Sequence, residues 1–462
     1  MRKRMNQLIN HHPASFRDPS GFIYEKDGAY YRFVSSVYQP HYDLLQSSGL
    51  ADELIKQNLL LPFNEINENH TGRADWYKTL QPQPIPFISY AWEWSFEQLK
   101  DAALVTLSTC KASLKKGMIL KDATHTNIQF VDGKAKLIDT LSFETYEEGE
   151  SWVAYRQFCE CFLNPLLISV HKGIEAHKLL LSYPDGVPSL LTARLLPFKT
   201  RLTPVVYLHV HLHAKLSGMA GITDNAKTKK VSLKNIEQII QSLYDCITGL
   251  TLPSTSTTWN NYYEETILSN EYLSEKKKLV SSVLAELTYN SVIDLGANEG
   301  EFSLLCNKEA LVVSTDFDSA CINSFYLKVK TQKLKNILPL IIDLTYPSPA
   351  MGWVNNERSA FFNRKTFDVG FALALIHHLA IGKNISFDQL AVFFADICDQ
   401  LLIEFVPKED PKIKDMLQSR KDIFDGYTEE QFQTAFEKTF ILKKKMPVPG
   451  SLRVLYMYQK QP

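Results

Sequence analysis

The stretch SVIDLGANEGEF, residues 291–302, decides the fold of the second half of the chain. It begins as an apolar run that reaches an acid at Asp294, and two glycines four positions apart follow, Gly296 and Gly300. A short apolar run followed by a glycine-containing turn is typical of a buried strand that leads into a nucleotide-binding loop. The stretch therefore predicts a ligand site at the carboxyl end of a strand in an α/β sheet.

Four further apolar runs follow, and each reaches a polar residue. We expect strands that end at Asp316, at Asp343, near His377 and near Glu404. Helix-like segments separate these runs, a pattern that predicts a parallel sheet with crossover helices. The last segment, residues 440–460, reads as strand, Pro/Gly turn and strand, which predicts an antiparallel hairpin.

The loop after the first strand does not suit a phosphate. A dinucleotide fingerprint needs a middle glycine, and Asn298 stands in its place. Glu299 and Glu301 would lie at the start of the next helix, where a phosphate would need to bind. No Gly-Lys-Ser/Thr sequence ends the loop, so it is not a P-loop. The loop therefore favours a ligand that carries no phosphate at this point.

The D-x-G-x-x-x-G pattern resembles motif I of class I methyltransferases that use S-adenosylmethionine (SAM). The resemblance covers about residues 257–462 and implies a seven-stranded Rossmann-like sheet. It implies that the two glycines let the backbone approach the methionine part of SAM, that Asp316 accepts hydrogen bonds from the ribose and that Asp343 lies beside the adenine. The cofactor-binding residues that it implies are Asp294, Gly296, Ala297, Asn298, Gly300, Asp316, Phe317, Asp343, Leu344 and Ala374.

His377 and His378 follow the fourth expected strand, and two interpretations of them stay open. One is structural: one histidine caps the next helix and the other packs in the core. The other is that either histidine acts as the catalytic general base for an acceptor hydroxyl or amine, because a neutral imidazole is suited to accept a proton near pH 7.

The first half carries a second constellation, in residues 117–143. Asp122 precedes Asn127 by five positions, and a strand–turn–strand pair then leads to Asp139. This arrangement resembles the catalytic loop of protein-kinase-like enzymes, and it implies an α+β kinase-like domain in which Asn127 and Asp139 would hold magnesium. The usual histidine before the first aspartate is Lys121 here, and no glycine-rich loop or strand lysine in a V-A-I-K context is found. We therefore expect a degenerate kinase-like domain that binds a substrate or partner.

Residues 249–265 contain Gly, Pro and a Ser/Thr cluster, which predicts a boundary. We expect a kinase-like domain at 1–248, a linker at 249–263 and a methyltransferase domain at 264–462. The whole arrangement also resembles a bacterial family related to a rhizobial nodulation methyltransferase. The aromatic residues of the linker either close over the SAM sulfonium or clasp the two domains; they are Trp259, Tyr262 and Tyr263.

The resemblance implies methyl transfer from SAM to an unidentified O- or N-nucleophile. The alternatives are a SAM-binding scaffold without catalysis and a bifunctional kinase-methyltransferase. Lys+Arg at 50 balances Asp+Glu at 51, so no nucleic-acid partner is indicated. No apolar stretch is long enough for a membrane span, and seven cysteines without a CxxC pair favour a reducing cytoplasm. His209, His211 and His213 alternate within a segment that reads as helix, which predicts no metal site.

Overall fold

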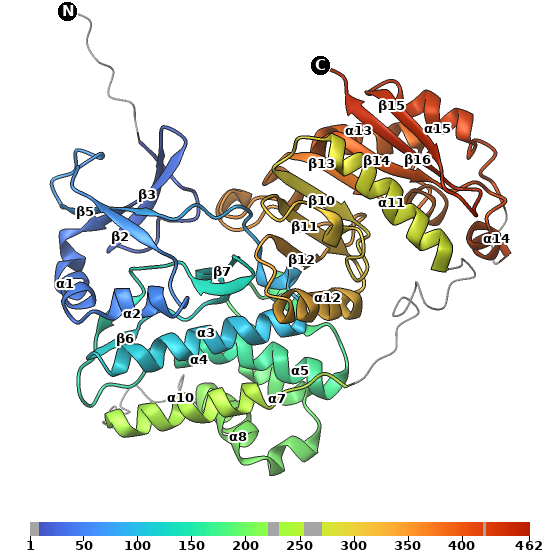
Figure 1. The fold of residues 1–462 in the computed structure, drawn as a ribbon. Coiled ribbons are helices and arrows are strands. Elements are labelled where there is room, and N and C mark those ends of the chain that lie inside the picture. The colour runs from blue at the N-terminus through green and yellow to red at the C-terminus, as the bar shows by residue number, and fades with distance from the viewer. Residues whose placement is uncertain (1–8, 220–230, 254–269, 419–421) are drawn as a thin grey trace, which may run out of the picture. The chain divides into compact units, whose positions relative to one another are not determined.

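The computed structural model describes residues 9–219, 231–253, 270–418 and 422–462. The described residues form two compact units (Figure 1). The first unit is built from residues within 1–254 together with 349–359, and the second from residues within 255–348 and 360–462. The linker aromatics Trp259, Tyr262 and Tyr263 lie outside the described residues, so both interpretations of them remain predictions.

An antiparallel sheet of five strands, in the order β1-β2-β3-β5-β4, opens the first unit (Figure 1). The D-G turn at Asp27–Gly28 joins β2 to β3, and both residues have left-handed φ angles of 52° and 74°, as a tight hairpin turn requires. The elements are β1 (Asn10–His11), β2 (Gly21–Lys26), β3 (Ala29–Ser35), α1 (Gln39–Ser47), α2 (Leu50–Lys56), β4 (Phe63–Ile66) and β5 (Trp76–Pro82).

A long, largely buried helix, α3 (Phe96–Leu114), follows, and Ser95 caps its first turn. The hydroxyl of Ser95 accepts the N–H of Gln98, and the Gln98 side chain returns a bond to the Ser95 N–H, which forms a capping box. Two short antiparallel pairs come next. They are β6 (Met118–Leu120) with β9 (Phe143–Thr145), and β7 (Ile128–Val131) with β8 (Lys134–Leu137).

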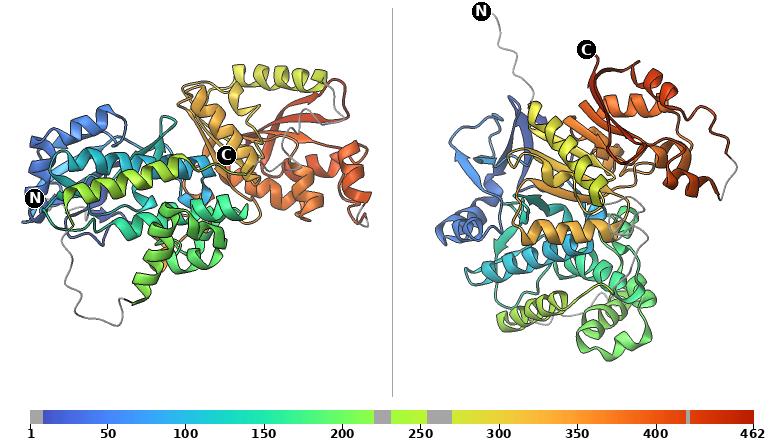
Figure 2. Two further views of the ribbon diagram at one scale, coloured as in Figure 1. Left: turned by 90° about the horizontal axis from the view of Figure 1, so that it is seen from below. Right: turned by 45° about the vertical axis from the view of Figure 1, so that its right-hand side comes forward.

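Helices make up most of the rest of the first unit, and α10 packs alongside α3 (Figures 1 and 2). The segment that carries His209, His211 and His213 is helical, which confirms the predicted helix. The helices are α4 (Tyr155–Phe158), a π-helix (Cys159–Leu163), α5 (Asn164–Lys172), α6 (Leu179–Ser182), α7 (Ser189–Leu195), α8 (Pro204–Val206), a π-helix (Tyr207–Leu212), α9 (His213–Met219) and α10 (Leu233–Thr248).

Residues 349–359 lie between two strands of the second unit in sequence but belong to the first unit. Their turn is held by Glu357, whose side chain is 4% exposed and accepts the N–H of Trp353 at 2.6 Å. Both carboxylate oxygens of Glu357 also accept hydrogen bonds from the guanidinium of Arg17, the nearer at 2.5 Å. A two-pronged arginine–carboxylate pair of this kind fixes the orientation of both side chains.

The second unit is built on one sheet of seven strands in the order β12-β11-β10-β13-β14-β16-β15. The strands from β12 to β14 are parallel, and β15 and β16 form an antiparallel hairpin on the β14 side. This confirms the seven-stranded α/β sheet with a final hairpin. The strands are β10 (Ser291–Leu295), β11 (Leu311–Asp316), β12 (Ile337–Ile341), β13 (Phe367–Ala372), β14 (Cys398–Phe405), β15 (Phe440–Pro447) and β16 (Val454–Lys460).

Two strand ends differ from the prediction. β12 stops at Ile341, two residues before Asp343, and β13 stops at Ala372, five residues before His377. The apolar run after β13 misled the prediction because it continues through a turn whose Leu373 and Ile376 are buried like strand residues. Ala374 turns the chain with a left-handed φ of 53°, which ends the extended backbone.

Helices cover both faces of this sheet (Figures 1 and 2). On one face, α11 (Asn270–Glu286) and α12 (Ser319–Thr331) share an apolar core with alternate strand residues such as Val292 and Leu402. On the other face, α13 (Phe387–Ile397) and α15 (Glu429–Phe436) join an aromatic cluster that includes Tyr458. A further helix, α14 (Pro411–Gln418), follows β14. The sheet is thus the middle of three layers.

The glycine turn after β10 generates a stability prediction. Gly300 has a φ of 79°, and a Cβ placed there would lie 2.0 Å from the ring of Phe325. Gly300→Ala should therefore lower the free energy of unfolding of the second unit by about 2–4 kcal/mol, through overpacking and left-handed strain together. Urea denaturation would measure the loss. Gly450→Ala is the matched control, because Gly450 has a similar φ of 72° but no atom near its absent Cβ, so about 1 kcal/mol is expected. Equal losses in the two variants would contradict the packing argument.

Candidate functional site

The carboxyl ends of the parallel strands carry the residues that the sequence singled out. The glycine turn after β10 is fixed to the end of β11, because the N–H groups of Gly296 and Ala297 both donate to the carbonyl of Thr315, at 2.8 and 2.9 Å. Gly300 then donates to the carbonyl of Ala297 at 2.8 Å and closes the turn. This arrangement brings the turn beside Asp316, the last residue of β11.

Asp316 is held by backbone donors on both carboxylate oxygens. One oxygen accepts the N–H of Asn298 and the other the N–H of Asp318, both at 2.9 Å. The side chain is buried, and burial raises the pKa of Asp316 to about 6 despite these bonds. The backbone N–H of Phe317 also favours the charged form of this carboxylate. A carboxylate offers about four acceptor sites, so Asp316 can still accept a hydrogen bond from a ligand. Phe317, the next residue, is half exposed.

Asp294 lies deeper, at the end of β10, and is 2% exposed. Its carboxylate accepts the hydroxyl of Ser303 at 2.6 Å, and Ser303 also contacts the hydroxyl of Ser314 at 2.7 Å. Burial is the largest cause that raises the pKa of Asp294 to about 6; the hydrogen bond from Ser303 opposes it, the charge of Asp316 adds to it, and the charge of Lys276 opposes it. Two aspartates at neighbouring strand ends are therefore buried carboxylates that ionise near pH 6.

Asp343 lies two residues beyond β12. It accepts the N–H and the hydroxyl of Thr345 with the same oxygen, at 2.8 and 2.7 Å, which leaves the second oxygen available to other donors. Asp343 and Leu344 are both partly exposed. The third predicted acid is thus held by its own turn, at the edge where β11 also ends.

Two non-glycine residues at this edge have left-handed backbones. Asn298 in the glycine turn has a φ of 49°, and Ala374 after β13 has a φ of 53°. The two turns face each other, since a Cβ on Gly296 would meet the side chain of Leu375 at 3.3 Å. Strained backbone of this kind clusters at functional sites, where the surrounding structure enforces it.

The histidine pair is divided between the interior and the surface. His377 is 0% exposed, and neither ring nitrogen contacts a hydrogen-bond partner within the described residues. Burial, followed by the charges of His378 and Arg453, holds its pKa well below the ordinary value. His378 is partly exposed, and burial with nearby cations lowers its pKa to about 4. The rings lie 4.1 Å apart, and both imidazoles are neutral at pH 7.

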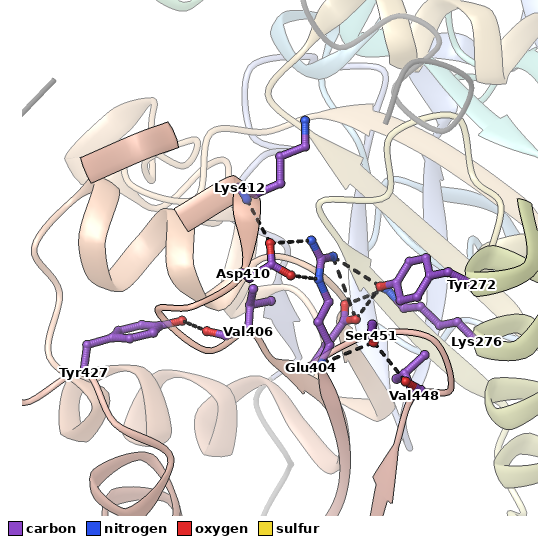
Figure 3. A network of polar contacts seen from close by, with 10 residues as sticks. Tyr272, Lys276, Glu404, Val406, Asp410, Lys412, Tyr427, Val448 and Ser451 are labelled. Carbon is purple, nitrogen blue, oxygen red and sulfur yellow. Dashed lines mark hydrogen bonds and ion pairs between the residues drawn. The ribbon is translucent and has the colours of Figure 1, made fainter. Parts of the chain in front are cut away.

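A set of buried charges beside this site was missed by the sequence prediction (Figure 3). Lys276 of α11 contacts Glu404 at the end of β14 at 2.6 Å, and both side chains are essentially unexposed. Tyr272 donates to Glu404 at 2.7 Å, and Arg453 pairs with Asp410 at 2.8 Å. The available signal was a lysine on the apolar face of α11, four residues after Tyr272 and four before Val280.

In the first unit, the three residues of the second constellation come together. Asn127 donates to the hydroxyl of Ser142 at 3.2 Å, and Ser142 donates to Asp139 at 2.6 Å. Burial and then the charge of Asp139 raise the pKa of Asp122. Sequence reasoning missed Arg32 of β3, whose guanidinium lies 2.6 Å from the other oxygen of Asp139. The prediction considered only a strand lysine in a V-A-I-K context, whereas the cation that pairs with Asp139 is an arginine on β3.

Metal ligands do not gather in the part of the chain that the structure describes: no group of three or more His, Cys, Asp or Glu side chains is placed to hold an ion. The carboxylates at the sheet edge are each engaged by protein donors. Within the described ranges, no helix has the length and apolar character to cross a bilayer.

Comparison with known proteins gives one relative of full length. The chain is 31% identical over 456 residues to the nodulation protein NoeA of Rhizobium meliloti, covering 96% of this chain and 95% of that one. No family model matches.

Solved structures match smaller parts. The N-methyltransferase NodS from Bradyrhizobium japonicum is 10% identical, with a TM-score of 0.31, over 42% of this chain and 99% of its own. The magnesium protoporphyrin IX methyltransferase of Synechocystis, solved with S-adenosylhomocysteine (SAH), is 15% identical, with a TM-score of 0.32, over 44% and 92%.

Asp294 generates a prediction on the pH dependence of stability. Its pKa of about 6 in the folded chain exceeds the value of about 4 for an unfolded aspartate. Between these values the unfolded chain loses its proton first, so this residue reduces stability as the pH rises from about 4 to about 6. Asp294→Asn should therefore raise the free energy of unfolding by about 1–3 kcal/mol at pH 7.5 and by much less at pH 4.

Urea denaturation at the two pH values would measure this difference. Asp396→Asn, at an exposed position of α13, is the control and should show no gain at either pH. A gain for Asp294→Asn of the same size at both pH values would contradict the burial argument, because it could not come from ionisation.

Proposed function

We propose that this chain, which belongs to the family of the nodulation protein NoeA, transfers a methyl group from SAM to an acceptor with a nucleophilic oxygen or nitrogen. The observation that carries the proposal is the convergence of the glycine turn, Asp316 and Asp343 at the carboxyl edge of one parallel sheet. In open α/β sheets, this edge is where ligands bind. The sequence predicted a seven-stranded sheet with these residues at its strand ends, and the seven-stranded sheet is observed.

The residues present fit SAM. Asp316 is a carboxylate at the end of β11 that keeps acceptor capacity beyond its backbone donors, which suits the hydroxyls of a ribose. Phe317, half exposed beside it, offers an aromatic face to the adenine. Gly296 has a left-handed φ and only Leu375 near its absent Cβ, so the backbone can lie close to the methionine part. Ala297, Asn298, Gly300, Leu344 and Ala374 complete the proposed cofactor site.

When bound, SAM supplies an electrophilic methyl group on a positively charged sulfonium. The ionised carboxylates of Asp294 and Asp316 favour a cation at this edge. Orientation of the acceptor in line with the methyl group would supply much of the rate.

His377 and His378 remain the proposed catalytic residues on the acceptor side. Of the two, the partly exposed His378 is the better placed to contact an acceptor directly, and His377 stands behind it. A neutral imidazole can accept a hydrogen bond from an acceptor hydroxyl or amine. The lowered pKa of His378 makes it a weak base, so we expect orientation of the acceptor to contribute more than proton removal.

For the first unit, we propose a kinase-like domain that binds a substrate or partner without phosphotransfer. The order of its elements supports the proposal, with an antiparallel sheet, a long helix and the loop of Asp122 and Asn127 between short strand pairs. Asp139 is already engaged: Arg32 and the N–H of Leu141 share one oxygen, and Ser142 occupies the other. A carboxylate engaged in this way is a poor magnesium ligand unless Arg32 moves.

Two alternatives follow from the same residues. A scaffold that binds SAM without turnover would show tight binding and no methylated product with cell extracts. A bifunctional enzyme would bind magnesium and nucleotide at Asp139. We also propose a cytoplasmic location, which is supported by the seven cysteines, all within the described residues and none joined in a disulfide.

The ribose site gives the first functional prediction. Asp316→Ala removes both acceptor oxygens, and a charge-assisted hydrogen bond contributes about 1.5–3 kcal/mol. Calorimetric titration should show SAM affinity reduced tenfold or more. Asp399→Ala, an exposed change at the opposite end of β14, should bind SAM as the wild type does. Unchanged affinity in a folded Asp316→Ala protein would rule out this cofactor site.

The second functional prediction concerns the kinase-like unit. Millimolar Mg-ATP should leave the melting temperature unchanged, whereas SAM should raise it. A ligand at a hundred times its dissociation constant adds about 2.7 kcal/mol to stability. Differential scanning fluorimetry of the full chain would compare the two ligands. A Mg-ATP shift that disappears in Asp139→Ala, while the SAM shift survives, would establish the bifunctional alternative instead.

A further inference from the structure

Lys276 is a cation in the interior of the second unit. Its side chain is 1% exposed, and it lies on the face of α11 that packs on the sheet. Removal of an ammonium group from water costs several kcal/mol, which a close partner must offset. Glu404 is that partner, at 2.6 Å (Figure 3). A lysine that only stabilised the fold could be replaced by an apolar side chain without such a cost, so its presence calls for a further role.

The pair belongs to a larger set of contacts that fixes its position. Tyr272 donates to Glu404 from the preceding turn of α11 and also accepts from Arg453 at 3.2 Å. Arg453 holds Asp410 through two hydrogen bonds, at 2.8 and 3.2 Å. The formal charges of Lys276, Arg453, Glu404 and Asp410 cancel, so the set is neutral as a whole and rigidly positioned.

Lys276 also lies close to the glycine turn after β10. Its ammonium is 4.8 Å from the ring centroid of Phe302, and the next residue, Ser303, donates to Asp294. The groups that act on the Asp294 carboxylate are the hydroxyl of Ser303, the neighbouring charge of Asp316 and the ammonium of Lys276, with Cys306 also within electrostatic range. Of these groups, Lys276 supplies the positive charge.

We propose that Lys276 is a positioning residue for the cofactor, whose buried ammonium, fixed by Glu404, keeps the Asp294 carboxylate ionised beside the glycine turn. The inference rests on the proposed SAM site. The electrostatic field at the proposed site would then be set by α11 and β14, two elements that carry none of the predicted cofactor contacts. The charge on Asp294 then favours the sulfonium, and its loss at low pH weakens SAM binding.

Two substitutions should both raise the pH at which SAM binding is lost. Lys276→Met removes the positive charge, so Asp294 should protonate at a higher pH and SAM affinity should begin to fall about one pH unit earlier as the pH is lowered. Glu404→Gln removes the anion that offsets the burial of Lys276, so the ammonium should lose its proton more readily and Asp294 should again lose its positive neighbour. Lys276→Arg, which keeps the charge, separates this shift from a general loss of stability.

Calorimetric titration of SAM into the full chain from pH 5.5 to 8.5 would measure these midpoints, with circular dichroism to confirm folding. Lys276→Arg should restore the wild-type midpoint, because it retains the charge. Lys278→Met is the matched control, since Lys278 lies on the exposed side of the same helix and pairs only with the partly exposed Glu275 among the ion pairs of the described residues.

The outcomes separate the two proposals. If the wild type binds no SAM at any pH, the proposed function fails. If it binds SAM but Lys276→Met and Glu404→Gln leave the midpoint unchanged or move it to a lower pH, the role of Lys276 is wrong while the SAM site stands. If Lys276→Met does not fold, Glu404→Gln and Lys276→Arg still decide the question.

Discussion

The pairing of buried charges between α11, β14 and the final hairpin is the interaction on which the second unit depends. Lys276, Glu404, Arg453 and Asp410 are each at most 2% exposed, so loss of one partner would leave an uncompensated charge in the core. Because such a loss is costly, the four charges are stable only when all of them are in place. The pairing links α11 to the sheet, and Lys276 also contacts Phe302, which follows the glycine turn after β10. The interior side of the glycine turn is therefore stabilised by buried charge as well as by packing.

Much of the second unit could be predicted from the sequence because its signals are local. The strands are continuous apolar runs, Asp294 and Asp316 lie at their carboxyl ends, and the glycine turn follows directly. Parallel topology then brings these residues together without further information. The predicted end of β13 was wrong because an apolar run in the sequence does not distinguish a strand from a buried turn. The left-handed φ of Ala374 marks where the extended backbone stops.

The parts that could not be predicted depend on pairs distant in sequence. Arg32 and Asp139 are 107 positions apart, and Lys276 and Glu404 are 128 apart, so no window of sequence shows that either cation has a partner. The histidine pair illustrates the same limit. His377 and His378 are adjacent in sequence and were equivalent as candidates, yet the turn after β13 sends one ring into the core and leaves the other partly exposed.

The segment 349–359 has a consequence for how this chain can be divided. Because it belongs to the first unit while its flanks belong to the second, the backbone passes from one unit to the other three times. A fragment that starts after the linker would contain Glu357 without Arg17, and a fragment that stops before the linker would contain Arg17 without Glu357. A single cut at the linker therefore leaves the first unit incomplete, whereas the C-terminal piece holds the whole second unit together with a segment of the first.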